Sequence, residues 1–177
     1  MRLSRVLATV ALASMLTPLL TACNDDPDAA VKEAHDPLQF RRVLEPGDLP
    51  EDCSTVPGHG SAAQPDSTAE VIACDDDGVV YRLSPAEIVG GVERATAGLS
   101  PQGVGWIVTF ELDNDAAKAF EAISTELSGT GKQFAVLFDN AVLSAPVVQT
   151  AITDGRLQIT GDFTRAEAEE LADGLKP

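Results

Sequence analysis

Three cysteines and two histidines are the residues of this chain best suited to covalent or metal chemistry. Cys53 and Cys74 form an even pair once Cys23, close to the N-terminus, is set apart. In an exported chain such a pair is typical of a disulfide, and we expect these two residues to be bonded. A metal site with His35 and His59 is the alternative. The spacing of these residues matches no zinc motif, so we expect neither a metal nor a cofactor.

The first 22 residues have the features of a secretory signal. Arg2 and Arg5 precede residues 6–20, which are apolar and carry no charge, and small residues follow them. A membrane-spanning helix needs about 20 apolar residues, and an acidic stretch begins directly after this shorter run. The pattern therefore predicts a cleaved signal peptide over residues 1–22 rather than a permanent transmembrane anchor.

The end of this signal resembles a bacterial lipobox. Its last residues, 20–23, read Leu-Thr-Ala-Cys. The resemblance implies that the Cys23 thiol carries diacylglycerol, that Cys23 becomes the mature N-terminus, and that acyl chains such as palmitate are attached there. Two or three acyl chains hold a protein firmly to a bilayer, whereas a single chain binds weakly. We therefore expect a lipoprotein anchored through Cys23 on the extracytoplasmic face of the cell membrane.

The charge of the chain limits its partners. Twelve Lys and Arg residues stand against 28 Asp and Glu residues, for a formal net charge of −16 over 177 residues. Nucleic acid is excluded as an expected partner, because its recognition requires a basic surface that neutralises phosphates. Hydrophobic residues make up 44% of the chain, which is enough for a folded core.

The chain divides by composition into a tether, a bridged segment and a domain. Residues 23–50 are rich in Asp, Pro and Ala and are expected to be a flexible tether, with a weak strand pattern at 39–44. Residues 51–88 are expected to be a disulfide-linked hairpin segment, with its turn at residues 75–78, Asp-Asp-Asp-Gly. Those consecutive acids lack the alternate spacing of a calcium loop, so a solvated turn is preferred. Residues 89–177 form the expected domain.

Periodicity within residues 89–177 predicts strands and two helices. Alternating apolar residues at 104–112 indicate a half-buried strand, and the run 134–138 indicates a strand that is buried on both faces. Apolar residues at 116, 120, 123 and 127 lie on one helix face, and a capping box at Thr164 starts a second helix. We expect an α+β fold of the ferredoxin-like kind, an antiparallel sheet with both helices on one face.

Several motifs in this region belong together. Residues 136–146 read VLFDNAVLSAP, residues 152–156 read ITDGR, and residues 158–164 read QITGDFT. With VTFEL at 108–112 and EAEELA at 167–172, they resemble the head subdomain of the first extracytoplasmic domain of SecD, part of the SecDF protein-export machinery. The resemblance extends over residues 89–175, about half of the chain, and implies a domain that engages exported polypeptide.

The expected function follows from this resemblance and from the lipid anchor. SecD continues into transmembrane helices that couple proton flow to export, and this sequence shows none after residue 175, so we do not expect a motor. Nor do we expect an enzyme, because Ser144 has no histidine positioned as its base. We expect a noncatalytic, lipid-anchored envelope protein whose partner is exported polypeptide or the Sec machinery. The alternative is an envelope ligand-binding or structural module that reuses the fold without a role in export.

Overall fold

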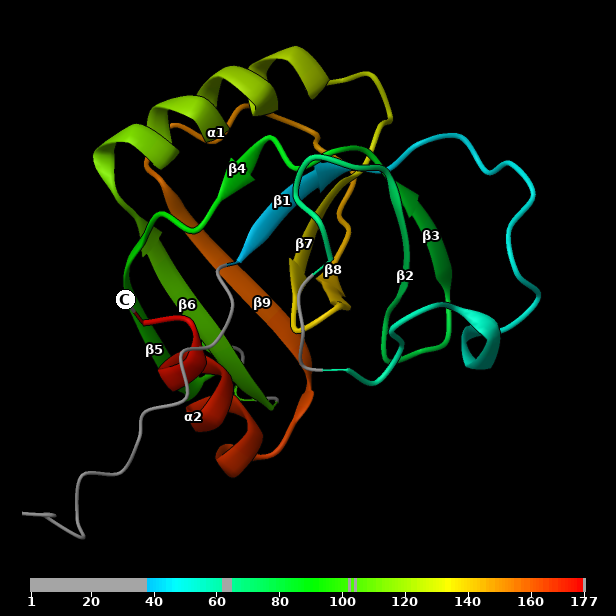
Figure 1. Cartoon of the computed structure of the whole chain (residues 1–177). Helices are drawn as coiled ribbons and strands as arrows, with labels where there is room; N and C mark the ends of the chain where they lie inside the picture. Colours follow the sequence, from blue (N-terminus) through cyan, green and yellow to red (C-terminus); the bar gives the residue numbers. More distant parts are fainter. Residues whose placement is uncertain (1–37, 62–64, 102, 104, 177) are drawn as a thin grey trace, which may run out of the picture. The chain divides into compact units, whose positions relative to one another are not determined.

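Two sheets and two helices build the part of the chain that the structure, a computed structural model, describes: residues 38–61, 65–101, 103 and 105–176 (Figure 1). The larger sheet has the strand order β3-β2-β8-β7-β1-β4. Its strands are β1 (Gln39–Arg42), β2 (Val71–Cys74), β3 (Val80–Leu83), β4 (Ile88–Val89), β7 (Phe134–Phe138) and β8 (Ala141–Ser144). The smaller sheet has the order β5-β6-β9, with β5 (Val92–Leu99), β6 (Trp106–Leu112) and β9 (Arg156–Phe163). The α-helices are α1 (Asn114–Leu127) and α2 (Arg165–Gly174), and η1 (Cys53–Thr55) is a short 3-10 helix.

The larger sheet curls back on itself. Beyond β1 the chain forms an isolated bridge between Val43 and Leu83 of β3. The Leu44 N–H also donates to the Arg82 carbonyl at 2.8 Å, on the same strand. The continuation of β1 therefore meets β3 at the far end of the strand order. The space enclosed by the curl holds a small apolar cluster of Ala73, Leu83, Ala135, Leu137 and Val142.

The larger core lies between the two sheets and the helices. Four aromatic rings meet there, from β1 (Phe40), β6 (Phe110), α1 (Phe120) and β7 (Phe134). The Phe40 centroid lies 5.4 Å from that of Phe120 and 6.2 Å from that of Phe134. Aromatic pairs at such separations add about 0.5–1.5 kcal/mol each beyond their buried area. The chain has few aromatic residues, and four of them are in this cluster. The cluster joins elements of both sheets.

β7 contributes to both apolar clusters. Its residues at 134, 136 and 138 face the larger core, and those at 135 and 137 face the interior of the curl. All five residues are buried. The expectation of a strand buried on both faces is confirmed, because alternate side chains of a strand point to opposite faces.

The capping box expected at Thr164 is confirmed, and α1 also has a local cap. The Asp113 side chain accepts from the backbone N–H groups of Asp115 and Ala116, and so caps α1. Thr164 and Glu167 form the reciprocal capping box of α2. Such caps satisfy backbone donors that have no partner within the helix. After residue 92 the chain forms two strands, a helix, three strands and a helix, in agreement with the strands and two helices predicted there.

The α+β class is confirmed, but the expected arrangement of one ferredoxin-like sheet needs correction. The strands are divided between two sheets, and β2 pairs with β8 in parallel through Cys74 and Ala141. The three-stranded sheet is antiparallel. Both helices pack in the larger core, which also contains the face of this sheet that bears Phe110. Hydrophobic alternation reports which face of a strand is buried, but it does not report which strand lies beside it.

β1 lies within the stretch 23–50, which was expected to be a tether. It pairs with β7 and β4, and Phe40 and Arg41 are fully buried. The segments expected at 51–88 and 89–177 share the larger sheet, and the described residues of both belong to one compact unit. The structure therefore does not separate these segments. The signal peptide and residues 23–37 of the expected tether lie outside the described residues.

The burial of Arg41 explains how β1 is held. Its guanidinium donates to the Gln39 side chain at 2.6 and 2.8 Å and to the carbonyls of Asp66, Ala69 and Ser84 at 2.6–2.8 Å. Burial lowers the pKa of Arg41, and the nearby charge of Asp66 acts in the opposite direction. Hydrogen bonds to a charged group contribute about 1.5–3 kcal/mol each. Arg41 thus fastens the segment 66–69 and the end of β3 to β1.

The described residues include no helix that is both long enough and apolar enough to cross a membrane.

Candidate functional site

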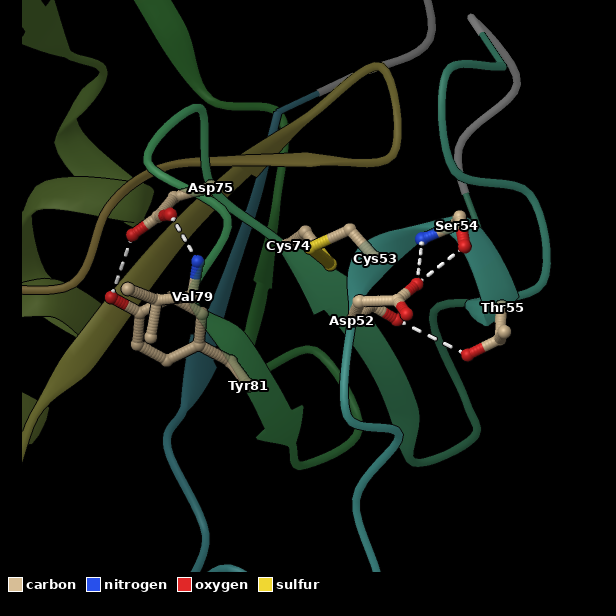
Figure 2. The surroundings of a disulfide bond; sticks show 8 residues. All are labelled: Asp52, Cys53, Ser54, Thr55, Cys74, Asp75, Val79 and Tyr81. Carbon is tan, nitrogen blue, oxygen red and sulfur yellow. Dashed lines mark hydrogen bonds between the residues drawn. A yellow bond between two sulfur atoms is a disulfide. The ribbon is translucent and has the colours of Figure 1, made fainter.

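The disulfide expected from the sequence is present. Cys53 at the start of η1 is bonded to Cys74 at the end of β2, with a Cα–Cα distance of 6.0 Å (Figure 2). The Asp52 carboxylate caps η1 by accepting from the Ser54 N–H at 2.9 Å. Because Cys74 also bridges to Ala141, the bond attaches the segment around residue 53 to the centre of the larger sheet. The other predicted site residue, Cys23, lies outside the described residues.

The acidic turn after Cys74 closes the predicted hairpin. Asp75 accepts from the Val79 N–H at 2.8 Å and from the Tyr81 hydroxyl at 2.9 Å (Figure 2). β2 and β3 pair antiparallel on either side, as expected. Burial, and then the hydrogen bond and charge of Asp75, raise the pKa of Tyr81 to about 12. Asp75 is therefore engaged in the turn itself.

A cleft opens beside this turn, between the larger sheet and the strand β9. Its volume is about 850 Å³. It is lined by seven acidic residues and by apolar side chains of β7, β8, β9 and α2, and no Lys, Arg or His lines it. The acidic residues are Asp75, Asp76, Asp77, Asp139, Asp162, Glu167 and Glu170, and the larger apolar ones are Phe138, Val142, Leu143, Phe163 and Leu171. The cleft thus combines an apolar lining with strong negative charge.

Five acids of the cleft form no ion pair with another of the described residues. No ion pair among those residues involves Asp162 or Glu170, or the three aspartates of the turn. Hydrogen bonds from the backbone N–H and the hydroxyl of Thr164 lower the pKa of Glu167. Glu167 therefore stays ionised at neutral pH, and the cleft presents a field that attracts cationic groups.

β9 presents an edge to this cleft. Within the described residues it pairs only with β6, and it is the last strand of its sheet. Thr160, Gly161, Asp162 and Phe163 of β9 all line the cleft. The pairing register shifts between Trp106 and Ile107, opposite these residues, which indicates a bulge in β9. The backbone groups on the outer edge of a terminal strand are available to pair with another chain.

Gly161 is the small residue at the centre of this edge. A Cβ atom built there would lie 3.0 Å from the ring of Phe163. Glycine within a strand often marks a bulge or a close approach of another group. Here it lets the Phe163 ring fold back along its own strand, where that ring contributes to the apolar lining of the cleft.

The disulfide has a third neighbour that the sequence did not connect with it. A ring nitrogen of His59 and the sulfur atoms of Cys53 and Cys74 lie within 4.8 Å of one another. His59 belongs to the Gly-rich loop that follows η1 and is exposed. His35, the other histidine weighed as a ligand, lies outside the described residues. Both sulfur atoms are bonded to each other here, so neither is a thiolate, the form that binds metal.

Comparison with known proteins assigns the fold to a family. Residues 69–176 match the family model described as the SecDF P1 head subdomain, so the chain belongs to that family. The predicted resemblance to the SecD head is confirmed. The matched segment extends to residue 69, which adds β2, β3 and the acidic turn to the region recognised from the sequence.

Curated relatives agree with this assignment. The protein translocase subunit SecD of Mycobacterium tuberculosis is 35% identical over 120 residues, which cover 65% of this chain and 21% of that protein. SecD of Streptomyces coelicolor is 34% identical over 125 residues, 66% of this chain and 22% of that protein. SecD of Acetobacter pasteurianus is 38% identical over 86 residues, which cover 48% of this chain and 16% of that protein. The chain spans about a fifth of the length of these relatives.

Solved structures of SecDF share the fold. A crystal structure of SecDF in a super-membrane-facing form has a TM-score of 0.56 and 24% identity, over 81% of this chain and 19% of that one. A second structure, of a SecDF membrane component that enhances protein export, has a TM-score of 0.57 and 23% identity. The match covers 90% of this chain and 70% of that one. The curled sheets and the two helices are therefore the head architecture of these proteins.

Sequence reasoning missed the cleft, although it found most of the elements that build it. Asp75 and its neighbours are almost a hundred residues from Glu170 in the chain, so no spacing connects them. Arg41 was also missed, because a charged residue in a weakly alternating segment is usually exposed. A glycine within a strand pattern, at 161, was the one signal that pointed to an irregular edge.

Proposed function

We propose that this protein is a noncatalytic, lipid-anchored export module that binds exported polypeptide in the cleft beside β9. Cys23 would carry the lipid and hold the module on the extracytoplasmic face of the cell membrane. The proposal is supported by membership of the SecDF P1 head family and by the relatives, which are protein translocase subunits. The observation that carries it is the apolar and acidic cleft, which is lined by residues 160–163 of the terminal strand β9.

An unpaired strand edge suits a partner that is not yet folded. Addition of a strand uses backbone hydrogen bonds, which every polypeptide can make, so it binds many sequences. Alternate side chains of the added strand would then contact Phe163 and Leu143 in the cleft. A chain that has just crossed a membrane is extended and exposes the apolar side chains that such a lining accepts.

The charge of the cleft selects among extended chains. Attraction between opposite charges steers a partner toward a site and falls as salt is added. A segment that alternates apolar residues with Lys or Arg would place its apolar side chains in the cleft and its cations beside Asp162 and Glu170. An acidic segment of the same hydrophobicity would be repelled. The class of partner proposed is therefore an extended, basic and apolar polypeptide.

Peptide binding to the purified mature chain tests this proposal. A labelled peptide that alternates Val and Lys should bind, and its Val and Glu counterpart should not. Replacement of Asp162 and Glu170 by Lys should weaken binding of the basic peptide at least about tenfold, because opposed charges across an interface are strongly unfavourable. Glu121→Lys, which changes an exposed acid of α1 outside the cleft, is the matched control. Equal binding of both peptides by both variants would contradict the proposal and favour the module without an export role.

The anchor is tested separately in cells. Cys23→Ser removes the thiol that would be acylated, so the variant should leave the membrane fraction or remain unprocessed. Fractionation with and without the substitution measures this. A processed Cys23→Ser protein that stays in the membrane fraction would show that attachment does not depend on lipid at this residue.

A further inference from the structure

The group formed by Cys53, His59 and Cys74 carries an inference that goes beyond polypeptide binding. Their donor atoms lie within 4.8 Å of one another, although the residues come from three separate parts of the fold. Cys53 begins η1, Cys74 ends β2, and His59 lies in the loop between them. Two sulfur ligands and one imidazole are a donor set that zinc and softer cations prefer.

Each donor is positioned by contacts other than the disulfide. Cys74 is 1% exposed and pairs with Val80 of β3 as well as with Ala141 of β8. Cys53 lies in a 3-10 turn that Asp52 caps, and its carbonyl accepts from the Val56 N–H at 3.1 Å. These contacts belong to the backbone, so they remain if the bond between the sulfur atoms is broken.

The loop that carries His59 is held in the same way. The His59 N–H donates to the Val56 carbonyl at 3.2 Å, and the Ser61 N–H donates to the Gly58 carbonyl at 2.9 Å. Gly58 has a φ of +78°, and a Cβ atom there would lie 2.6 Å from Nδ2 of Asn140. Only glycine therefore fits where the loop crosses the turn between β7 and β8. This close approach fixes the residue next to His59 against the centre of the larger sheet.

We propose that reduction of the Cys53–Cys74 disulfide creates a site for a zinc-like divalent cation, bound by both thiolates and by His59. A dithiol donates two electrons to the bridge: the bond between the two sulfur atoms breaks, two thiols form, and the dithiol becomes a disulfide. On binding, each thiol loses its proton to solvent, and water occupies the fourth position. The two cysteines cannot be joined by a disulfide and bind the metal as thiolates at the same time.

The geometry and charge of this region fit such a site. Zinc lies about 2.3 Å from sulfur and 2.0–2.1 Å from nitrogen, so tetrahedral donors are roughly 3.5 Å apart. The sulfur atoms would move apart and the imidazole would move closer, each by about an ångström. Asp52 directly precedes Cys53 in the chain, so an acidic side chain lies near the pair. The chain as a whole has a net charge of −16, which also favours a cation.

The spacing of these residues argued against a metal site when the sequence was considered alone. Zinc motifs usually contain closely spaced pairs of ligands, and none is present here. In the structure, the loop brings His59 close to the two cysteines. A metal site is therefore possible once the pair is reduced. Bound metal would in turn protect the thiols from oxidation, since it consumes the thiolate form that reacts.

Cobalt binding to the mature chain tests the proposal, because a Co²⁺ thiolate complex has charge-transfer absorption that Zn²⁺ abolishes on displacement. The oxidised protein should bind no Co²⁺ at this site. The protein reduced with a metal-free phosphine should bind one Co²⁺ per chain, with that absorption. His59→Ala should weaken binding at least about tenfold and alter the visible spectrum, whereas the matched control Ser54→Ala should do neither.

Three results would overturn the proposal. The first is a reduced protein that keeps its circular dichroism spectrum but binds no Co²⁺. The second is a His59→Ala protein that binds with the same affinity and spectrum as the parent chain. The third is loss of the folded spectrum on reduction alone, because the proposed site needs the folded loop and sheet to bring His59 to the two cysteines.

Discussion

Strands β7 and β9 lie in the same matched family segment but have opposite surroundings. β7 is paired on both edges, with β1 and β8, and all five of its residues are buried. Among the described residues β9 pairs with β6 alone, and only one of its eight residues, Ile159, is buried. The first strand is closed to any partner, and the second keeps one edge and most of its side chains accessible.

The difference separates stability from recognition within one small domain. The side chains of β7 fill two apolar clusters, so its sequence is restricted by packing. Apart from Gly161, where a Cβ atom would meet the Phe163 ring, the exposed residues of β9 are not restricted in that way, and they include Asp162 at the cleft. Substitutions in β7 should therefore affect folding, and substitutions on the exposed positions of β9 should affect binding with little change in stability.

The largest expected effect comes from removing β1, the outer partner of β7. A chain that begins at Val89 keeps both helices but lacks β1, β2 and β3 and one of the two residues of β4. β7 then loses its pairing with residues 39–42, and the aromatic cluster loses Phe40. We expect no cooperative thermal transition by circular dichroism. A chain that begins at residue 34 is the control and should melt cooperatively. Cooperative melting of the shorter chain would show that β7 does not depend on β1.

A single substitution in β7 should cost less but still be large. Phe134→Ala removes a ring that is 2% exposed and lies 5.6 Å from the Phe120 ring, between centroids. We expect the free energy of unfolding to fall by about 3–5 kcal/mol. Gln158→Ala, at an exposed position of β9, should change it by no more than about 0.5 kcal/mol. Urea denaturation of both variants measures the contrast, and similar losses in the two would remove the distinction between the strands.

The smallest expected effect concerns the turn on the rim of the cleft, opposite β9. Tyr81 is the only tyrosine of the chain, so alkaline phenolate absorbance reports it alone. Its midpoint should lie near the pKa of about 12, above the value of about 10 of an unfolded chain. Because the folded pKa is raised, the stabilisation is complete below pH 10 and is lost as pH rises through the folded value.

Asp75→Asn sharpens this measurement. The substitution removes the carboxylate that accepts a hydrogen bond from the Tyr81 hydroxyl and repels the phenolate. The ring stays as buried as before. The midpoint should therefore fall part of the way toward 10. Asp76→Asn, in the same turn, is the control and should shift it less, because Asp76 does not contribute to the raised pKa. An unchanged midpoint in Asp75→Asn would place the Asp75 carboxylate elsewhere in solution.

Much of the local structure was predictable because its signals are short in range. The faces of α1 and β6, the caps at Asp113 and Thr164, and the turn at 139–140 all follow from neighbouring residues. Asp139 and Asn140 have φ values of +47° and +58°, a conformation that short polar side chains tolerate. The disulfide was predictable for another reason, since two cysteines in a chain that is expected to be exported have few alternatives.

The place of β1 was not predictable from residues 38–43 alone. Phe40 is an apolar residue in a short and weakly alternating segment, and Arg41 and Arg42 beside it indicate exposure. In the fold, Arg41 is buried by carbonyls from segments 66–69 and 84, and Arg42 pairs with Glu87 and Glu126. These partners are distant in the chain, so the compensation that allows the charges to lie there is visible only in three dimensions.

The sequence by itself determined the signal pattern, the acidic charge, the order of strands and helices after residue 92, and the family of the domain. Each of these features depends on composition or on contacts between residues that are close in the chain. Tertiary structure alone decided that the strands form two sheets, that β9 keeps a free edge beside seven acids, and that His59 returns to the Cys53–Cys74 bridge. Those features depend on which distant segments pack together, and the period of a hydrophobic pattern specifies a buried face without specifying its partner.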